Sequence, residues 1–219
     1  MSKKNLARRI SVKLTKIIED SMNDTNEIAS VQLEIMKRRR SVRKFLPVPI
    51  PVDVLERIAA AGTFAPSSGN GQPCRFLVID DKDIIQSLIT SSADVLFEEK
   101  PDENAKQRFL ASSRRYEKAS AIILVLEDNE SPYPEYSVHD CPLAAANIIL
   151  LATSYGYGST YLTDSICPDG IRRAISLPER YTPYCAIAIG VPDEIPHSPK
   201  KKPMTEVVWR NILGESFPT

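Results

Sequence analysis

One segment of the sequence, residues 121–126 (Ala-Ile-Ile-Leu-Val-Leu), is wholly apolar and rich in β-forming residues. So short and so apolar a run is typical of a central strand that is buried on both faces. Further strands are expected at about 75–80, 159–163 and 184–190, where the pattern alternates or is again apolar. Helices and strands intermix along the chain, so the fold class is α+β or α/β.

Helical periodicity occupies most of the sequence between these strands. The helix from about 137 to 155 is so rich in small apolar residues that it should be buried on most sides. An earlier helix is expected to begin with Asp24 as its cap, at capping-box spacing from Glu27, and to direct four apolar residues inward: Ile28, Val31, Ile35 and Met36. The other expected helices are one with Leu55, Ile58 and Ala59 inside, one at about 84–89, an exposed one within 100–118, and a short one near 169–175.

The first residues form a separate feature. Leu6 to Ile18 repeat at helical spacing among lysines and arginines, with no acidic residue before Glu19. A basic amphipathic helix of this kind can be a targeting peptide or lie on a membrane surface. The interpretation favoured here is an appendage that packs on its own domain or on a partner subunit. We therefore divide the chain into an N-terminal helical extension, residues 1–24, and one domain, residues 25–219.

Composition excludes several classes of protein. The chain has 28 basic and 28 acidic residues, so no overall field favours nucleic acid or an anionic membrane. No apolar run reaches the roughly 18–20 residues that a membrane span requires. The four cysteines are widely spaced without a C-x-x-C pair, which favours reduced thiols in a cytoplasmic protein and argues against a metal site. We expect neither a nucleic-acid nor a membrane partner.

Several common catalytic motifs are missing from the sequence. It contains no P-loop, no G-x-S-x-G and no H-E-x-x-H. Gly156-Tyr157-Gly158 begins like a dinucleotide fingerprint, but it precedes a strand where the fingerprint should follow one. The two histidines, His139 and His197, leave little for triad chemistry and are expected on the surface.

Positive charge and small polar loops remain as the candidate functional features. Residues 37–44 are almost entirely basic, and 200–202 are three lysines. The first cluster could be a solvated helix end, a nucleic-acid patch, or an anion site for a phosphate-bearing cofactor. The loop of residues 65–73, which follows it closely, is dense in turn formers, hydroxyls and amides. This context shifts the interpretation toward an anion site.

At this point the two segments can be compared with known motifs. Residues 39–45, Arg-Arg-Ser-Val-Arg-Lys-Phe, and residues 65–73, Ala-Pro-Ser-Ser-Gly-Asn-Gly-Gln-Pro, resemble the R-R-S-x-R-x-F and A-P-S-x-x-N-x-Q-P motifs of the FMN-dependent nitroreductase family. Order and spacing also fit, and weaker similarity extends the resemblance from about Glu27 to Val208. One departure is Cys74, where many members of the family carry Trp after Gln-Pro.

The resemblance implies a nitroreductase-like α+β fold of three layers, with a central mixed, mainly antiparallel sheet flanked by helices. It also implies a homodimer with FMN at the subunit interface and NADH or NADPH as electron donor. The implied activity is electron transfer to a small planar acceptor such as a nitroaromatic, a quinone or a flavin. The alternatives are a specialised reductive reaction such as dehalogenation, or a flavin-binding sensor without turnover.

By the same resemblance, the flavin performs the hydride step and no side-chain acid or base is required. Arg43 would tune the flavin, because a fixed cation near N1 and the C2 carbonyl favours the reduced state. Arg39 and the lysine tail would hold the phosphate, backbone amides near Thr163 and Asp164 would face N5, and the 65–73 loop would reach the flavin of the other subunit. The implied cofactor-binding residues are Arg39, Arg40, Ser41, Arg43, Pro66, Ser67, Ser68, Asn70, Gln72, Thr163, Asp164, Lys200 and Lys202.

Overall fold

The computed structural model describes residues 25–162 and 166–218 and contains one five-stranded sheet. Its strands are β1 (Phe45–Leu46), β2 (Cys74–Ile79), β3 (Ala121–Asp128), β4 (Gly158–Leu162) and β5 (Tyr181–Pro192). β3 lies between β2 and β5, and the far edge of β5 pairs with β4 and then with β1. All four ladders are antiparallel, and one isolated parallel bridge joins Ser41 to Ser159. The sheet is therefore mixed and mainly antiparallel, as predicted.

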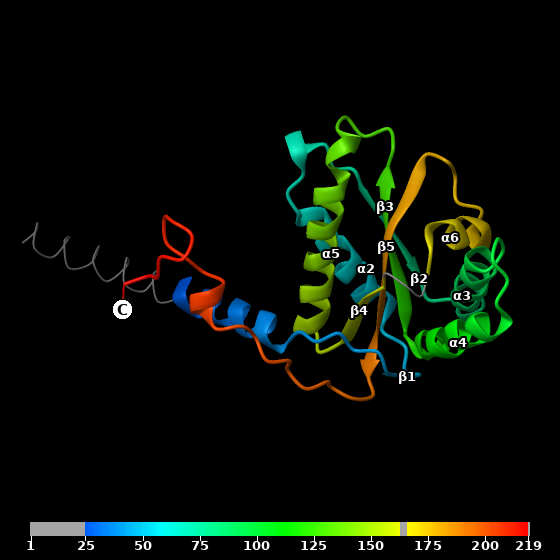
Figure 1. The fold of residues 1–219 in the computed structure, drawn as a ribbon, viewed down its shortest axis with the longest axis horizontal. Helices are drawn as coiled ribbons and strands as arrows, with labels where there is room; N and C mark the ends of the chain where they lie inside the picture. Colours follow the sequence, from blue (N-terminus) through cyan, green and yellow to red (C-terminus); the bar gives the residue numbers. More distant parts are fainter. Residues whose placement is uncertain (1–24, 163–165, 219) are drawn as a thin grey trace, which may run out of the picture.

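Helices cover both faces of this sheet and produce three layers (Figure 1). On one face lie α2 (Val52–Ala60) and α5 (Ser137–Ser154); on the other lie α3 (Lys82–Leu96), α4 (Glu103–Ser113) and α6 (Pro168–Ile175). Short 3-10 turns occupy Ala61–Phe64, Ser68–Asn70, Arg114–Lys118, Pro134–Tyr136 and Met204–Glu206.

The central strand explains why two layers of helices form. In β3, Ile122 and Leu124 belong to the core cluster on the α3 side, whereas Ile123 and Val125 belong to the cluster on the α5 side. Successive side chains of a strand point to opposite faces, so an uninterrupted apolar run fills two cores at once. The predicted buried strand is confirmed and extends two residues further, to Asp128.

The interior predicted for α2 is confirmed, and that of α5 is confirmed except along a narrow outer face. Leu55, Ile58 and Ala59 are buried beneath α2. The inner face of α5 is buried, but Val138 and Leu143 on its outer face are exposed, Leu143 at 46%. The prediction of burial on most sides is confirmed, since most residues of α5 are buried or half-buried, but the other described residues leave its outer face uncovered.

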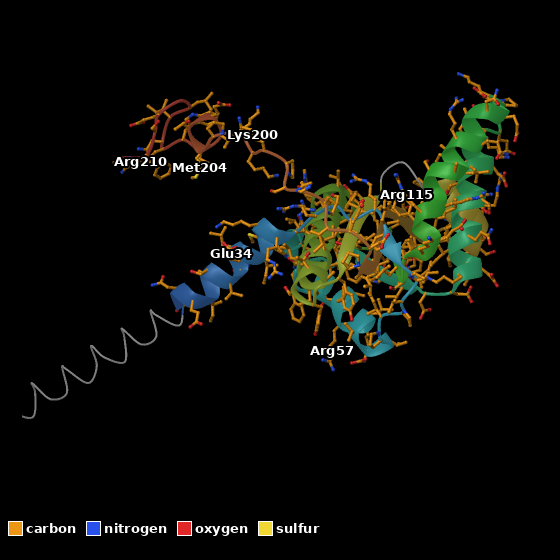
Figure 2. All side chains as sticks on the ribbon, turned by 90° about the horizontal axis from the view of Figure 1, so that it is seen from below. Glu34, Arg57, Arg115, Lys200, Met204 and Arg210 are labelled. Carbon is orange, nitrogen blue, oxygen red and sulfur yellow. The ribbon has the colours of Figure 1, made fainter. Side chains whose placement is uncertain are left out.

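The predicted inward direction of the early helix is also wrong for the isolated chain. This helix covers residues 25–38, and it projects away from the sheet, as does the C-terminal tail that carries Lys200, Met204 and Arg210 (Figures 1 and 2). Ile28 is 68% exposed, Val31 and Met36 are also exposed, and Ile35 is half-buried. The amphipathic pattern predicted an apolar face correctly, but the other described residues do not cover that face.

Two predictions lie wholly or partly outside the described residues. The extension 1–24, including Asp24, is not described, nor are Thr163 and Asp164. Among the described helices, none is long and apolar enough to cross a membrane.

Candidate functional site

A cation-rich groove lies where the end of the helix over 25–38 meets the segment after β5. It encloses about 610 Å³. Two stretches of chain line it: Met36, Lys37, Arg39, Arg40, Ser41 and Arg43 from the first, and Pro196, His197, Ser198, Pro199 and Lys201 from the second. Thus the basic block meets the segment that contains the lysine tail, about 160 residues further along the sequence.

Sheet pairing assembles this groove. Phe45 of β1 pairs with Pro192 of β5, the Asp193 N–H donates to the Lys44 carbonyl at 3.0 Å, and an ion pair of 3.0 Å joins Lys44 to Glu194. These contacts fix the direction in which the tail leaves the sheet. They therefore place residues 196–201 opposite the arginines.

A glycine on β4 allows the arginine segment to lie close against the sheet. The Val42 N–H donates to the Ser159 carbonyl at 3.0 Å, and the buried Val42 side chain packs over Gly158. A Cβ at Gly158 would lie 2.8 Å from Val42, closer than side chains pack. Gly158 thus permits the close approach that positions Ser41 and Arg43 at the groove.

The groove carries an excess of positive charge, since its lining contains no acidic residue. Lys37 pairs with Glu34 outside it at 2.8 Å, and the Arg40 guanidinium donates to the carbonyls of Lys37 and Arg39 at the helix end. Within the described residues, Arg39, Arg43 and Lys201 have no carboxylate partner. Three such cations are suited to an anion, with the guanidinium groups able to bind phosphate oxygens in pairs.

The lysine tail differs in detail from the expectation. All three lysines are exposed, but Lys201 lines the groove, whereas Lys200 and Lys202 lie outside the lining. Successive residues of an extended segment point to opposite sides, so one lysine of the three faces the arginines. His197 also lines the groove, a position that its sequence context did not reveal.

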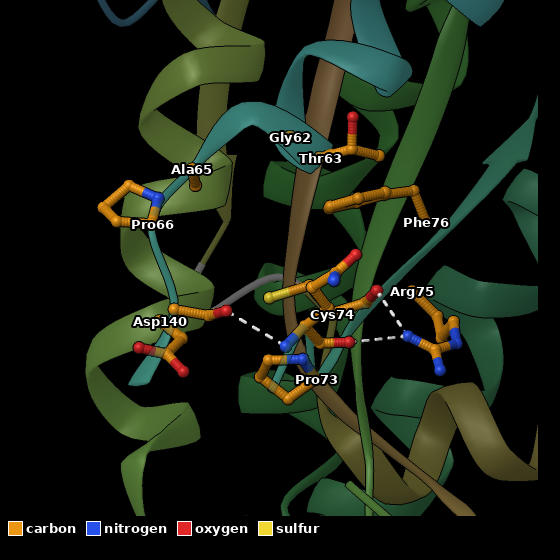
Figure 3. A pocket seen from close by; sticks show the side chains of 11 residues that line it. Gly62, Thr63, Ala65, Pro66, Pro73, Cys74, Arg75, Phe76 and Asp140 are labelled. Atoms are coloured by element: carbon orange, nitrogen blue, oxygen red, sulfur yellow. Dashed lines mark hydrogen bonds between the residues drawn. The ribbon is translucent and has the colours of Figure 1, made fainter. Parts of the chain in front are cut away.

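The second motif forms a tightly constructed loop beside a separate cavity of about 280 Å³ (Figure 3). The Ser67 hydroxyl accepts the Gln72 N–H at 3.0 Å, and the Ser67 carbonyl accepts the Asn70 N–H at 2.9 Å. Gly69, Asn70 and Gln72 all have positive φ, at 56°, 55° and 47°. For the two non-glycine residues this conformation is uncommon, and such backbone is often found at functional sites.

Asp140, in the first turn of α5, holds this loop through a hydrogen bond to its backbone. It is 4% exposed, and its two carboxylate oxygens accept the Ser68 N–H at 3.3 and 3.2 Å. It also lines the cavity together with Pro66, Ser67 and Gln72. The sequence analysis above assigned Asp140 no role. A lone acidic residue within an apolar helix was the signal that it has a polar partner.

One chain does not bring the groove and the loop into a single site. Asp140 lies beside the loop, whereas Thr153 lines a small cavity that also contains Arg40. These two positions on α5 are 13 residues apart, which at 1.5 Å per residue is about 20 Å. The two motifs therefore stand at opposite ends of α5.

Comparison with known proteins is consistent with these features. The family model described as "Nitroreductase family" matches residues 36–191. A protein of Methanothermobacter thermautotrophicus that is provisionally named an NADH dehydrogenase/NAD(P)H nitroreductase is 28% identical over 169 residues, which cover 75% of this chain and 78% of that protein. An iodotyrosine deiodinase of Thermotoga neapolitana is 26% identical over 187 residues, covering 81% of this chain and 95% of that protein.

A solved structure from Desulfovibrio desulfuricans, provisionally described as a nitroreductase and determined in complex with FMN, is similar over 85% of this chain and 98% of its own. The TM-score is 0.66 and the sequence identity is 28%.

Proposed function

Because this chain belongs to the nitroreductase family, we propose that it is an FMN-dependent oxidoreductase that passes electrons from NADH or NADPH to a small planar acceptor. The observation that carries the proposal is the groove, in which Arg39, Arg43 and Lys201 face one volume without an acidic residue in the lining. FMN, when bound, supplies a carrier that accepts a hydride from one substrate and delivers electrons to another. The acceptor class is a nitroaromatic, a quinone or a flavin.

The residues present fit the phosphate of FMN. Arg39 is half-buried just after the helix over 25–38, lines the groove and has no carboxylate partner among the described residues, so its guanidinium can donate to phosphate oxygens. The lysines of 200–202 add charge from the facing segment. Arg40, whose guanidinium already donates to the helix end, positions the backbone and contributes its charge.

Arg43 and Ser41 would lie beside the part of the cofactor that gains negative charge. A fixed cation at that place makes reduction more favourable, and it does so without a proton transfer from the protein. The backbone near Thr163 and Asp164 would supply the amides that face N5. No side chain is then needed as a general acid or base.

The loop that carries Pro66, Ser67, Ser68, Asn70 and Gln72 would complete the site from a second copy of the chain, in a homodimer. Three features support this arrangement. The loop and the groove of one chain lie toward opposite ends of α5, the outer face of α5 carries the exposed Val138 and Leu143, and the two projecting segments carry exposed apolar side chains. The exposed apolar side chains include Ile28, Phe64, Leu143, Trp209 and Leu213.

The test is made on the purified full-length protein. We expect a yellow protein with noncovalent FMN, about one per chain, that bleaches with NADH or NADPH under nitrogen and regains its colour when a nitroaromatic or quinone is added. Protein that takes up no FMN at micromolar concentrations contradicts the proposal. Protein that holds FMN but is not bleached by either nucleotide would be a flavin-binding sensor.

Reductive dehalogenation is a second candidate, favoured by the similarity to the deiodinase of Thermotoga neapolitana. The same anaerobic experiment separates the two functions. Reduced holoprotein is mixed with an iodinated phenol or with a nitroaromatic, and the faster reoxidation identifies the acceptor class. Release of iodide in step with recolouring would assign the dehalogenation.

A further inference from the structure

Two cysteines that are 67 residues apart in the sequence lie side by side in the fold. Cys74 begins β2 and Cys141 lies in the second turn of α5, and their sulfur atoms are 3.5 Å apart. Both are free thiols. A disulfide requires the sulfurs to approach to about 2.0 Å, a movement of about 1.5 Å that side-chain rotation and a small backbone shift can supply.

The two thiols differ in their access to solvent. Cys74 is half-buried and lines the cavity of about 280 Å³ beside the Ser67 loop (Figure 3). Cys141 is fully buried beneath it. A small oxidant entering the cavity therefore meets Cys74 first, and Cys141 is the nearest group to react with an oxidised Cys74. This is the arrangement of an attacking and a resolving cysteine.

We propose that Cys74 and Cys141 form a peroxide-reactive dithiol that closes reversibly to an intramolecular disulfide. The Cys74 thiolate attacks one oxygen of hydrogen peroxide, the O–O bond breaks, and the leaving hydroxide takes a proton to become water. The Cys141 sulfur then attacks the Cys74 sulfenic acid, the S–O bond breaks, and a second water leaves with the Cys141 proton. Two thiols and one peroxide give one disulfide and two waters; a dithiol reductant reverses the change.

The surroundings favour Cys74 as the first thiolate. Once Cys74 is ionised, the Cys141 S–H can donate to it, and this hydrogen bond lowers the pKa of Cys74 below the ordinary thiol value. Arg75 acts in the same direction, while burial and the carboxylates of Asp140 and Glu127 oppose it. The same hydrogen bond, together with burial, raises the pKa of Cys141.

The experiment titrates the reduced, full-length protein with hydrogen peroxide, alkylates the remaining thiols under denaturing conditions, and measures the mass. Four cysteines should be alkylated before peroxide and two after it, with the Cys74 and Cys141 peptides linked to each other. Treatment with dithiothreitol should restore four. In Cys141→Ser, the sulfenic acid on Cys74 should persist and be trapped by dimedone; in Cys74→Ser, no linked peptide should form.

Cys167→Ser is the matched control. Cys167 is also half-buried, but it packs against Ser92 on the other face of the sheet and accepts the Gly170 N–H at the start of α6, a role that serine can fill. This variant should still lose two alkylation sites with peroxide. If a variant fails to fold, the peptide map of the wild-type protein still shows whether Cys74 and Cys141 are linked after peroxide. Four alkylated cysteines after peroxide, conversion of Cys74 to sulfinic acid without a linked peptide, or a disulfide between two copies would each overturn the proposal.

Discussion

The groove and the loop, the two parts of the candidate site, are built in opposite ways. The groove is open and highly charged, and it is held together mainly by the pairing of β1 with β5 at its edge. The loop carries little charge of its own, yet its backbone is fixed by Ser67, by Asp140 and by three residues at positive φ. The groove supplies charge and the loop supplies shape.

This difference indicates how the two parts would divide the recognition of a cofactor. A charged groove can hold a phosphate in several orientations, because Coulomb attraction is only weakly directional. A rigid loop with oriented amides and hydroxyls restricts the orientation of a planar ring. In one chain the two parts lie toward opposite ends of α5, so the proposed site would combine the groove of one chain with the loop of another.

The largest expected effect comes from a mixed dimer. Arg43→Gln impairs the groove and Asn70→Asp impairs the loop, so each variant should be defective as a homodimer. If each site combines the groove of one chain with the loop of its partner, a heterodimer has one site with both lesions and one with neither. Isolated with two different tags, it should regain about half of the wild-type activity per dimer.

The control for that experiment is the double variant on one chain, paired with a wild-type chain. There each site carries one lesion, so its activity should stay near the level of the defective homodimers. A heterodimer of the single variants that is no more active than its parents, with FMN loaded and no subunit exchange, would mean that groove and loop act within one chain.

The next effect concerns the charge of the groove alone. Arg39→Ala should weaken FMN binding by about tenfold or more, because a charge-assisted contact contributes about 1.5–3 kcal/mol. Arg38→Ala is the matched control, since Arg38 is the preceding residue but is exposed and does not line the groove. Fluorescence titration of the apoprotein with FMN gives both dissociation constants. Equal affinities in the two variants would place the phosphate elsewhere.

A smaller effect is expected from the shape of the loop. Asp140→Ala removes the acceptor of the Ser68 N–H and should lower kcat/KM about fivefold to tenfold, equivalent to a hydrogen bond of about 1–1.4 kcal/mol. FMN affinity should change less than in Arg39→Ala. Asp140→Asn keeps a neutral acceptor and should recover part of the loss. The opposite result would be a lower affinity for FMN with a normal kcat/KM at saturating FMN. It would show that the loop contributes to the binding energy of FMN and not, as we propose, to the orientation of its ring.

The sequence could predict those features that depend on local pattern. The strand of residues 121–126 was predictable because both of its faces are apolar, and the interior of α2 because Leu55, Ile58 and Ala59 fall on one side. The pattern also identified an apolar face on the helix over 25–38. It could not say that this face is left exposed by the other described residues, since amphipathicity does not specify which element covers an apolar face.

The rest of the candidate site depends on contacts between distant parts of the sequence. Asp140 meets Ser68 across 72 residues and Cys141 meets Cys74 across 67, and no periodicity contains such pairs. Likewise, three consecutive lysines predict a cationic tail, but the side of the extended segment that faces the arginines is set by its exit from β5. That is why Lys201 lines the groove.

The smallest expected effect is a loss of folding stability in acid, and it concerns the loop and its neighbour Asp128. Asp128, whose side chain is 1% exposed at the end of β3, bonds Arg75 at 2.7 Å and Arg180 at 2.8 Å, and its N–H donates to the carbonyl of Pro73, the last residue of the loop. The Arg180 hydrogen bond, aided by Arg75, lowers the pKa of Asp128 to about 2.

Because the folded pKa of Asp128 lies below its unfolded value of about 3.9, the unfolded state binds more protons between these values. The stabilisation by the Asp128 carboxylate is thus complete at neutral pH and is lost as the pH falls through about 4 toward about 2. Both arginines are nearly half exposed, so we expect Asp128→Asn to cost only about 1 kcal/mol at neutral pH. Urea unfolding of both proteins should give a constant difference down to about pH 5 and a shrinking one below it. An unchanged difference at about pH 3 would mean that the charge of Asp128 does not support the loop, and that the hydrogen bonds of Asp128 act equally well when its side chain is neutral.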